Sequence, residues 1–176
     1  MVKRTWVTAA IAVAFAGSAG AQSSRWEVMD DQTITRTLSF AAGGGRTLDV
    51  RNINGSIHVE AGSGSTVEMS IRKVIRAETQ NDLAEAQREV QVEFTDNTAR
   101  VGATVTEWNR HVCGQRREDD EGRRPRRRRY SVKYDFTIRV PRDVAIRLCT
   151  INGGDVVVNG TRGDFDVTNV NGDISM

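Results

Sequence analysis

The sequence predicts an all-β protein, a β-solenoid or β-helix-like stack of short strands with one short helix and an arginine-rich loop insertion. The first observation is a repeat between residues 150 and 176, where Gly-Asp-apolar triplets begin at Gly154, Gly163 and Gly172, nine residues apart. The second is an Asn-Gly pair that recurs at residues 152–153 and 171–172, about twice that period. A fixed short period is typical of units that stack on one another.

The N-terminal segment, residues 1–21, has the layout of a secretory signal peptide. Lys3 and Arg4 precede a short apolar stretch over residues 7–15, and small residues end at Ala21 before Gln22. A buried N-terminal helix is the other interpretation. We expect an exported mature chain, periplasmic or extracellular at the cell envelope, without a transmembrane segment. Residues 22–32 are polar and predict a flexible lead-in to a domain over residues 33–176.

Charge and cysteine content fit an exported protein. The sequence has 25 Lys and Arg against 23 Asp and Glu, and removal of Lys3 and Arg4 leaves a neutral mature chain. Cys113 and Cys149 are the two cysteines. In an oxidising compartment they suggest one disulfide, which would close a loop of about 36 residues and stabilise the fold by about 3–4 kcal/mol. Two unpaired cysteines are the alternative, and both interpretations stay open.

Strand patterns begin after the lead-in. Apolar residues alternate over residues 33–40, and glycines 43–45 end that run. Residues 48–59 then place an Asn-Gly turn at Asn54-Gly55 between two apolar-x-apolar strands, an early copy of the C-terminal unit. Further alternating runs cover residues 67–71, 90–94, 101–105, 130–140 and 144–148. Such strands are too short to be stable alone, so we expect stacking to bury a continuous apolar ladder.

One segment has helical rather than strand character. Residues 78–90 are rich in helix formers and place Leu83, Ala86 and Val90 on one face. Asn81 is the expected N-cap, followed by Asp82 in the first turn. We expect this helix to cover one end or flank of the stack, where it would protect an exposed edge.

The turn residues form the first candidate site. Asp155, Asp164 and Asp173 fall at equivalent places in the repeat and predict a ladder of carboxylates. Calcium-binding β-rolls need a G-x-G pattern that is missing here, so aspartates that cap turns are favoured, and no metal or cofactor is expected. The structural turn residues are Asn54, Gly55, Asn152, Gly153, Gly154, Asp155, Gly163, Asp164, Asn171, Gly172 and Asp173.

A basic insertion over residues 106–129 is the second candidate site. Residues 110–129 hold nine arginines and four acids, a local net charge of +5. Such a run predicts a mobile loop whose acids neutralise its own arginines. The alternative is contact with an anionic surface such as lipopolysaccharide or anionic lipid; nucleic acid does not suit an exported chain. The candidate contacts are Arg116, Arg117, Arg123, Arg124, Arg126, Arg127, Arg128 and Arg129.

An enzyme is the rival class, because some β-helices process polysaccharides. The sequence has two histidines, His58 in a strand pattern and His111 beside the basic run. It contains none of the nucleophile-elbow, zinc-protease, phosphate-loop or Cys-x-x-Cys motifs. We therefore predict no catalytic residues and a chain that is not an enzyme.

The order of these patterns resembles a known family. An alternating strand over residues 130–141, then Thr150–Val158 and Thr168–Ile174 with their Asn-Gly turns, is similar to the "putative adhesin" domains of bacterial envelope proteins. Residues 48–59 match as well. The resemblance implies a β-solenoid-like, non-enzymatic module with a structural or binding role toward an envelope polysaccharide or protein. Such domains continue through more coils, so we expect a C-terminally truncated chain, with the basic run as an insertion.

Overall fold

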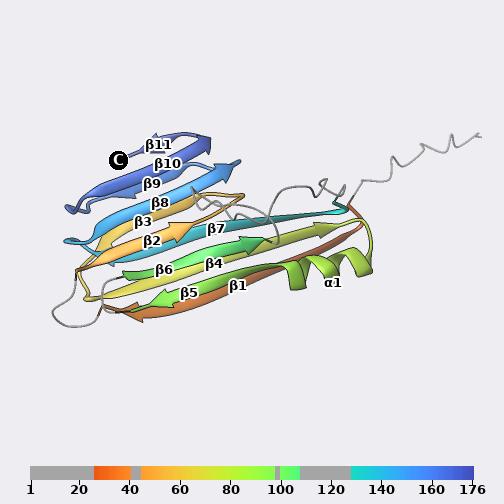
Figure 1. Cartoon of the computed structure of the whole chain (residues 1–176), viewed down its shortest axis with the longest axis horizontal. Coiled ribbons are helices and arrows are strands. Elements are labelled where there is room, and N and C mark those ends of the chain that lie inside the picture. The colour runs from red at the N-terminus through yellow and green to blue at the C-terminus, as the bar shows by residue number, and fades with distance from the viewer. Residues whose placement is uncertain (1–25, 41–44, 98–99, 108–127) are drawn as a thin grey trace, which may run out of the picture.

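A computed structural model describes residues 26–40, 45–97, 100–107 and 128–176, and it confirms the predicted all-β class with a short helix (Figure 1). The strands are β1 (Val28–Ser39), β2 (Thr47–Arg51), β3 (Ile57–Gly62), β4 (Thr66–Ala77), β5 (Val90–Asp96), β6 (Arg100–Glu107), β7 (Tyr130–Pro141), β8 (Ala145–Asn152), β9 (Val156–Asn159), β10 (Phe165–Asn171) and β11 (Ile174–Ser175). They form a six-stranded sheet A, ordered β1-β4-β7-β3-β9-β11, and a five-stranded sheet B, ordered β10-β8-β2-β6-β5.

Three strand–turn–strand units connect the two sheets, and we call them arches. Each arch runs from a strand in sheet B through an Asn-Gly turn into a strand in sheet A: β2 to β3, β8 to β9, and β10 to β11. Neighbouring arches pair in parallel and in register, with Leu48 opposite Ile146 and Phe165 also opposite Ile146. The predicted similarity between residues 48–59 and the C-terminal repeat is thus confirmed, because these units stack on one another in register. A full circuit of the chain runs from sheet B to sheet A and back to sheet B. The nine-residue period of the sequence covers about half of such a circuit.

Parallel pairs also join the first arch to the rest of each sheet, β3 with β7 and β2 with β6, and the pairs beyond them are antiparallel. Strands β1, β4 and β7 are twelve residues each and pair antiparallel, as do β5 and β6. Both sheets are therefore mixed and open at their edges, rather than one continuous parallel coil. The long strands extend beyond the arches, and α1 lies along this extension in Figure 1.

The apolar core lies between the sheets, because alternate residues of each strand face it. In β7 the alternation of buried and more exposed residues is regular from Tyr130 to Val140, with Tyr134, Phe136 and Ile138 almost fully buried. Leu48 of β2, Ile146 of β8 and Val156 of β9 are fully buried at the centre of the arches. The sequence periodicity of two thus places one face of every central strand in this core.

The helix α1 (Gln80–Glu89) confirms the predicted segment, with one correction at its start. Its N-cap is Thr79 rather than Asn81, because the Thr79 hydroxyl accepts a hydrogen bond from the Asp82 amide at 3.2 Å. Polar groups hold its C-terminal end, since Tyr134 Oη and Lys73 Nζ both donate to the Val90 carbonyl. Among the helices within these ranges, none is long and apolar enough to cross a membrane.

The predicted lead-in over residues 22–32 is wrong in its second half. Strand β1 begins at Val28 and pairs with β4 from Val28 opposite Ala77 onward. Polar residues such as Asp31 suit this position because they lie on the outer face, where Arg72 Nη2 contacts the Asp31 carboxylate at 2.6 Å. The proposed signal peptide, residues 1–21, lies outside the described ranges.

Candidate functional site

The Asn-Gly turns stack on one another at the edge where the sheets meet. Asn54 pairs with Asn152 across neighbouring arches, and Asn171 Nδ2 donates to Asn152 Oδ1 at 3.0 Å. A second row lies beside the first: Thr150 Oγ1 donates to the Gly55 carbonyl at 3.2 Å, and Asn169 Nδ2 donates to the Gly154 carbonyl at 2.9 Å. Each arch therefore binds the turn of the preceding arch through its side chains as well as its backbone.

The turns approach one another so closely that glycine is required. A Cβ at Gly154 would lie 2.2 Å from the Gly55 carbonyl carbon, and a Cβ at Gly55 would lie 2.2 Å from the Tyr134 carbonyl oxygen. Gly55 also has φ of +117°, a conformation that side-chain-bearing residues rarely adopt. The predicted turn role of these glycines follows from close backbone contact in addition to conformational freedom.

The three repeat aspartates do not form one ladder, which corrects the sequence prediction. Asp155 and Asp173 lie in the turns from sheet B to sheet A, whereas Gly163 and Asp164 lie in the return turn between β9 and β10. The cause is that nine residues advance the chain by about half a circuit. Asp155 Oδ1 accepts a hydrogen bond from the Asp173 amide at 3.2 Å, so it caps a turn as expected.

In the first arch the equivalent carboxylate comes from another strand. Asp135 of β7 accepts hydrogen bonds from the amide and hydroxyl of Ser56 at 3.0 and 2.9 Å, and Lys133 Nζ lies 3.0 Å from its carboxylate. Burial raises the pKa of Asp135, but the hydrogen bonds from Ser56 and Lys133 outweigh it, so the pKa is lowered overall.

We expect this carboxylate to make stability pH-dependent on the acid side. Because the folded pKa of Asp135 is below its unfolded value, its contribution is complete above pH of about 4 and is lost as pH falls through the folded pKa. Urea unfolding should show the stability gap between the wild type and Asp135→Asn shrinking as pH falls below about 4. Asp143→Asn, at an exposed position, serves as the control. A gap that stays constant down to pH 2 would contradict this role.

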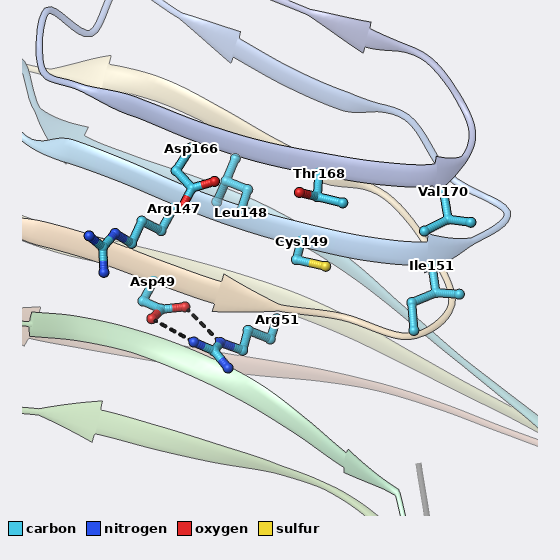
Figure 2. Close-up of a pocket in the computed structure, with 9 residues that line it drawn as sticks. All are labelled: Asp49, Arg51, Arg147, Leu148, Cys149, Ile151, Asp166, Thr168 and Val170. Atoms are coloured by element: carbon cyan, nitrogen blue, oxygen red, sulfur yellow. Dashed lines mark hydrogen bonds and ion pairs between the residues drawn. The ribbon is translucent and has the colours of Figure 1, made fainter. Parts of the chain in front are cut away.

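A groove crosses the outer face of sheet B where the three arches meet (Figure 2). Its volume is about 530 Å³, within the range of small-ligand sites. Strands β2, β8 and β10 supply the lining residues: Asp49, Arg51, Arg147, Leu148, Cys149, Ile151, Asp166, Thr168 and Val170. In-register parallel pairing places Arg147 between Asp49 and Asp166, and Cys149 between Arg51 and Thr168.

Asp49 lies in the charged half of the groove, where ion pairs hold its side chain in place. Its side chain is 8% exposed and contacts Arg51 Nε at 3.1 Å and Arg100 Nη1 at 3.1 Å. Two guanidinium groups compensate the cost of burying this carboxylate and hold it in one orientation. The Asp49 carboxylate is therefore occupied by contacts with Arg51 and Arg100 rather than available to a ligand.

Arg147 and Asp166 are the groups available to a ligand. Both are exposed, and no hydrogen bond or ion pair in the described part of the chain holds either side chain. Ile151 and Val170 form the apolar half of the groove, farther along the same strands (Figure 2). The lining holds two aspartates and two arginines, so its net charge is zero. It can offer a donor, an acceptor and an apolar patch to one ligand.

One of the two cysteines of the predicted disulfide, Cys149, lies in this groove. Cys149 lines it and is largely buried, in keeping with its place in an apolar run. Cys113 lies outside the described residues, so the pairing of Cys113 with Cys149 stays a prediction.

The basic insertion is described at its two ends. Strand β6 continues to Glu107, so residues 106 and 107 belong to a strand rather than a loop. Arg128 lies over the Tyr130 ring at 5.8 Å, and Arg129 Nε lies 3.9 Å from the Glu78 carboxylate. Arg116, Arg117, Arg123, Arg124, Arg126 and Arg127, like His111, lie outside the described residues.

Side chains that could ligate a metal do not cluster within the ranges given above. No group of three or more His, Cys, Asp and Glu side chains there could hold a metal ion. His58 lies exposed on the outer face of β3, as a strand position predicts.

The groove is the part of the site that sequence reasoning missed, although a signal was present. In each arch a charged residue interrupts the apolar-x-apolar triplet at the start of the unit: Asp49, Arg147 and Asp166. Aligning the three units by their Asn-Gly pairs would have placed these charges in one row on the outer face.

Comparison with known proteins gives a distant structural likeness. No family model matches the chain, and no curated protein matches it. A "putative adhesin" from Bacteroides fragilis is 18% identical with a TM-score of 0.39, over 81% of this chain and 53% of that one. A "putative cell adhesion protein" from Clostridium sporogenes is 7% identical with a TM-score of 0.39, over 81% and 59% of the respective chains. The chain thus spans between half and three-fifths of their length.

Proposed function

We propose that the chain is an exported, non-catalytic binding module of the cell envelope, of the adhesin-like, solenoid-related kind that the sequence resembles. Its binding surface is the groove across β2, β8 and β10, and its ligand is an envelope polysaccharide. The observation that carries this proposal is the exposed pair Arg147 and Asp166 beside the apolar patch of Ile151 and Val170.

The chemistry of the groove suits a sugar chain. A carboxylate accepts hydrogen bonds from hydroxyl groups and a guanidinium donates to hydroxyl oxygens, so Asp166 and Arg147 complement adjacent hydroxyls on one ring. The C–H face of a sugar can pack against Ile151 and Val170. Because the groove has no net charge, this binding should depend little on ionic strength.

Alanine substitutions at Arg147 and Asp166 test the groove. Each removes one charge-assisted hydrogen bond, worth about 1.5–3 kcal/mol, so affinity should fall by roughly 10- to 100-fold. The measurement is calorimetric titration with lipid-free envelope polysaccharide and, separately, with soluble peptidoglycan fragments. Arg139→Ala, at an exposed position on the outer face of sheet A, is the matched control. Unchanged affinity in both groove variants would refute the proposed surface.

The alternative function is contact with lipopolysaccharide or anionic lipid through the arginines of residues 116–129. The observation that favours it is the local excess of five positive charges in residues 110–129. Binding of that kind should weaken steeply as salt rises, unlike binding in the neutral groove.

A further inference from the structure

Strand β1 is the outermost strand of sheet A on the side away from the arches (Figure 1). Within the described ranges, no strand pairs with its free side. It pairs with β4 in one continuous register from Val28 to Ser39, without a bulge. It contains no proline and no lysine, which commonly keep an edge strand from pairing, and β-branched residues occupy positions 28, 33, 34, 35 and 37. This edge is therefore long, regular and suited to further strand pairing.

The backbone groups on the free side of β1 belong to its odd-numbered residues. The Glu78 amide donates to the Arg129 carbonyl at 2.9 Å, which extends the pairing of β4 with β7 by one pair. Because the two sides of a strand alternate in an antiparallel ladder, even-numbered residues of β4 bond to β7 and odd-numbered ones bond to β1. Their partners in β1 are even-numbered. The residues of β1 that point outward are therefore Met29, Asp31, Thr33, Thr35 and Thr37.

Two opposite charges share one face of this edge. Asp30 and Arg36 are both even-numbered residues of β1, so their side chains lie on the same side of the strand. Asp30 Oδ2 accepts the side-chain amides of Gln32 and Gln87, and its Oδ1 takes no hydrogen bond within the described residues. The Arg36 guanidinium lies 5.2 Å from the centre of the Phe94 ring and donates one hydrogen bond in the described part of the chain. Each of the two charges can therefore take a further partner of opposite sign.

A two-fold axis at Thr33 makes β1 complementary to a second copy of itself. In that antiparallel register, Asp30 of each copy lies opposite Arg36 of the other, so two ion pairs can form. Both are non-hydrogen-bonded pairs of the ladder, in which opposed side chains approach most closely. An axis at either neighbouring residue also keeps each side chain on its own face, but it places Arg36 opposite an uncharged residue. Charge complementarity thus selects the axis at Thr33.

The same register accounts for the other features of the edge. The outward-pointing residues map onto one another, since residue 29 faces 37, residue 31 faces 35 and residue 33 faces itself, so their backbone groups gain ladder partners. Met29 is 60% exposed and is the one large apolar side chain exposed in the described ranges outside residues 165–176. It would pack against Thr37 of the second copy.

We propose that β1 is a dimer interface, at which two copies of this chain join their A sheets into one continuous antiparallel sheet about an axis at Thr33. Backbone pairing supplies the affinity, and the pairs of Asp30 with Arg36 set the register. Opposed residues lie on the same face, so the two grooves on the outer faces of the B sheets face the same side of the dimer. That consequence rests on the proposed function, on which the dimer would bind one polysaccharide at two points. The interface itself requires no ligand.

Charge exchange tests the interface by sedimentation velocity of the full chain over a wide concentration range. The wild type should dimerise. Arg36→Asp places two carboxylates opposite each other and should weaken dimerisation by roughly tenfold or more, as Asp30→Arg should with two guanidinium groups. The double variant Asp30→Arg/Arg36→Asp restores the opposite charges and should restore the dimer. Arg76→Asp, at an exposed position of β4 away from the edge, is the control and should dimerise like the wild type.

Hydrogen exchange locates the interface on β1. The amides of Thr33 and Thr35 should gain protection as protein concentration rises, whereas those of Gln32 and Ile34, which already bond to β4, should not change. Circular dichroism checks that the variants fold. A monomeric wild type, an unweakened Arg36→Asp dimer, a double variant that stays monomeric, or a dimer without new protection at Thr33 and Thr35 would each overturn the proposal. Arg147→Ala in the groove should leave the dimer intact, so this proposal and the proposed function fail separately.

Discussion

Replacing Gly55 by alanine is expected to lower the free energy of unfolding by about 3 kcal/mol or more. Two costs add at this position. The backbone has φ of +117°, and the new Cβ would lie 2.2 Å from the carbonyl oxygen of Tyr134. Relief of that clash would push the first arch away from β7, because the contacted atom is backbone and cannot rotate aside. Urea unfolding followed by circular dichroism measures the loss.

Gly153→Ala is the matched control for this prediction. Gly153 also has a positive φ, +70°, but a Cβ added there would have no other atom within 4 Å. Its substitution carries the conformational cost alone, about 1–2 kcal/mol. Equal losses at Gly55 and Gly153 would mean that close stacking of the turns does not contribute, contrary to the structure.

Replacing Asn52 by leucine is expected to cost about 2–4 kcal/mol of stability. Asn52 is fully buried, its Nδ2 donates to the Tyr134 carbonyl at 2.8 Å, and its Oδ1 accepts the Ile53 amide at 2.9 Å. Leucine has a similar volume but leaves both backbone groups buried without partners. Thermal and urea unfolding of the variant should show a cooperative transition at lower temperature and lower denaturant.

The equivalent change at the open end should cost much less. Asn169 occupies the same row in the last arch, but it is half-buried there. Water can reach the carbonyl groups that Asn169→Leu would release, so we expect a loss below about 1 kcal/mol. A loss at Asn169 as large as at Asn52 would show that the ladder is not stabilised by burial.

The arches could be predicted from the sequence because their determinants are local. The Asn-Gly pair at Asn54-Gly55 and its copies specify a turn, and the apolar-x-apolar runs on either side specify two short strands. Stacking of equal units then follows from the need to bury their apolar faces. The helix was predicted for the same reason, although Thr79 rather than Asn81 caps it.

Long-range pairing could not be predicted in the same way. Nothing local in β7 specifies that it lies between β3 and β4, parallel to one and antiparallel to the other. The nine-residue period placed Asp164 with Asp155, because a period alone does not distinguish a full circuit from half of one. The groove depends on register among three arches, so Arg147 and Asp166 came together only in the structure.

The central claim is that the outer face of the stacked arches binds the envelope, and one measurement tests it most directly. Binding of the full chain to whole bacterial envelopes is compared at low and high salt with a variant lacking residues 116–127. That deletion keeps Arg129, whose carbonyl accepts the Glu78 amide at 2.9 Å. We predict binding that survives both the deletion and high salt, and that falls in Asp166→Ala. Loss of binding on deletion and at high salt would contradict the claim and assign the function to the arginine segment.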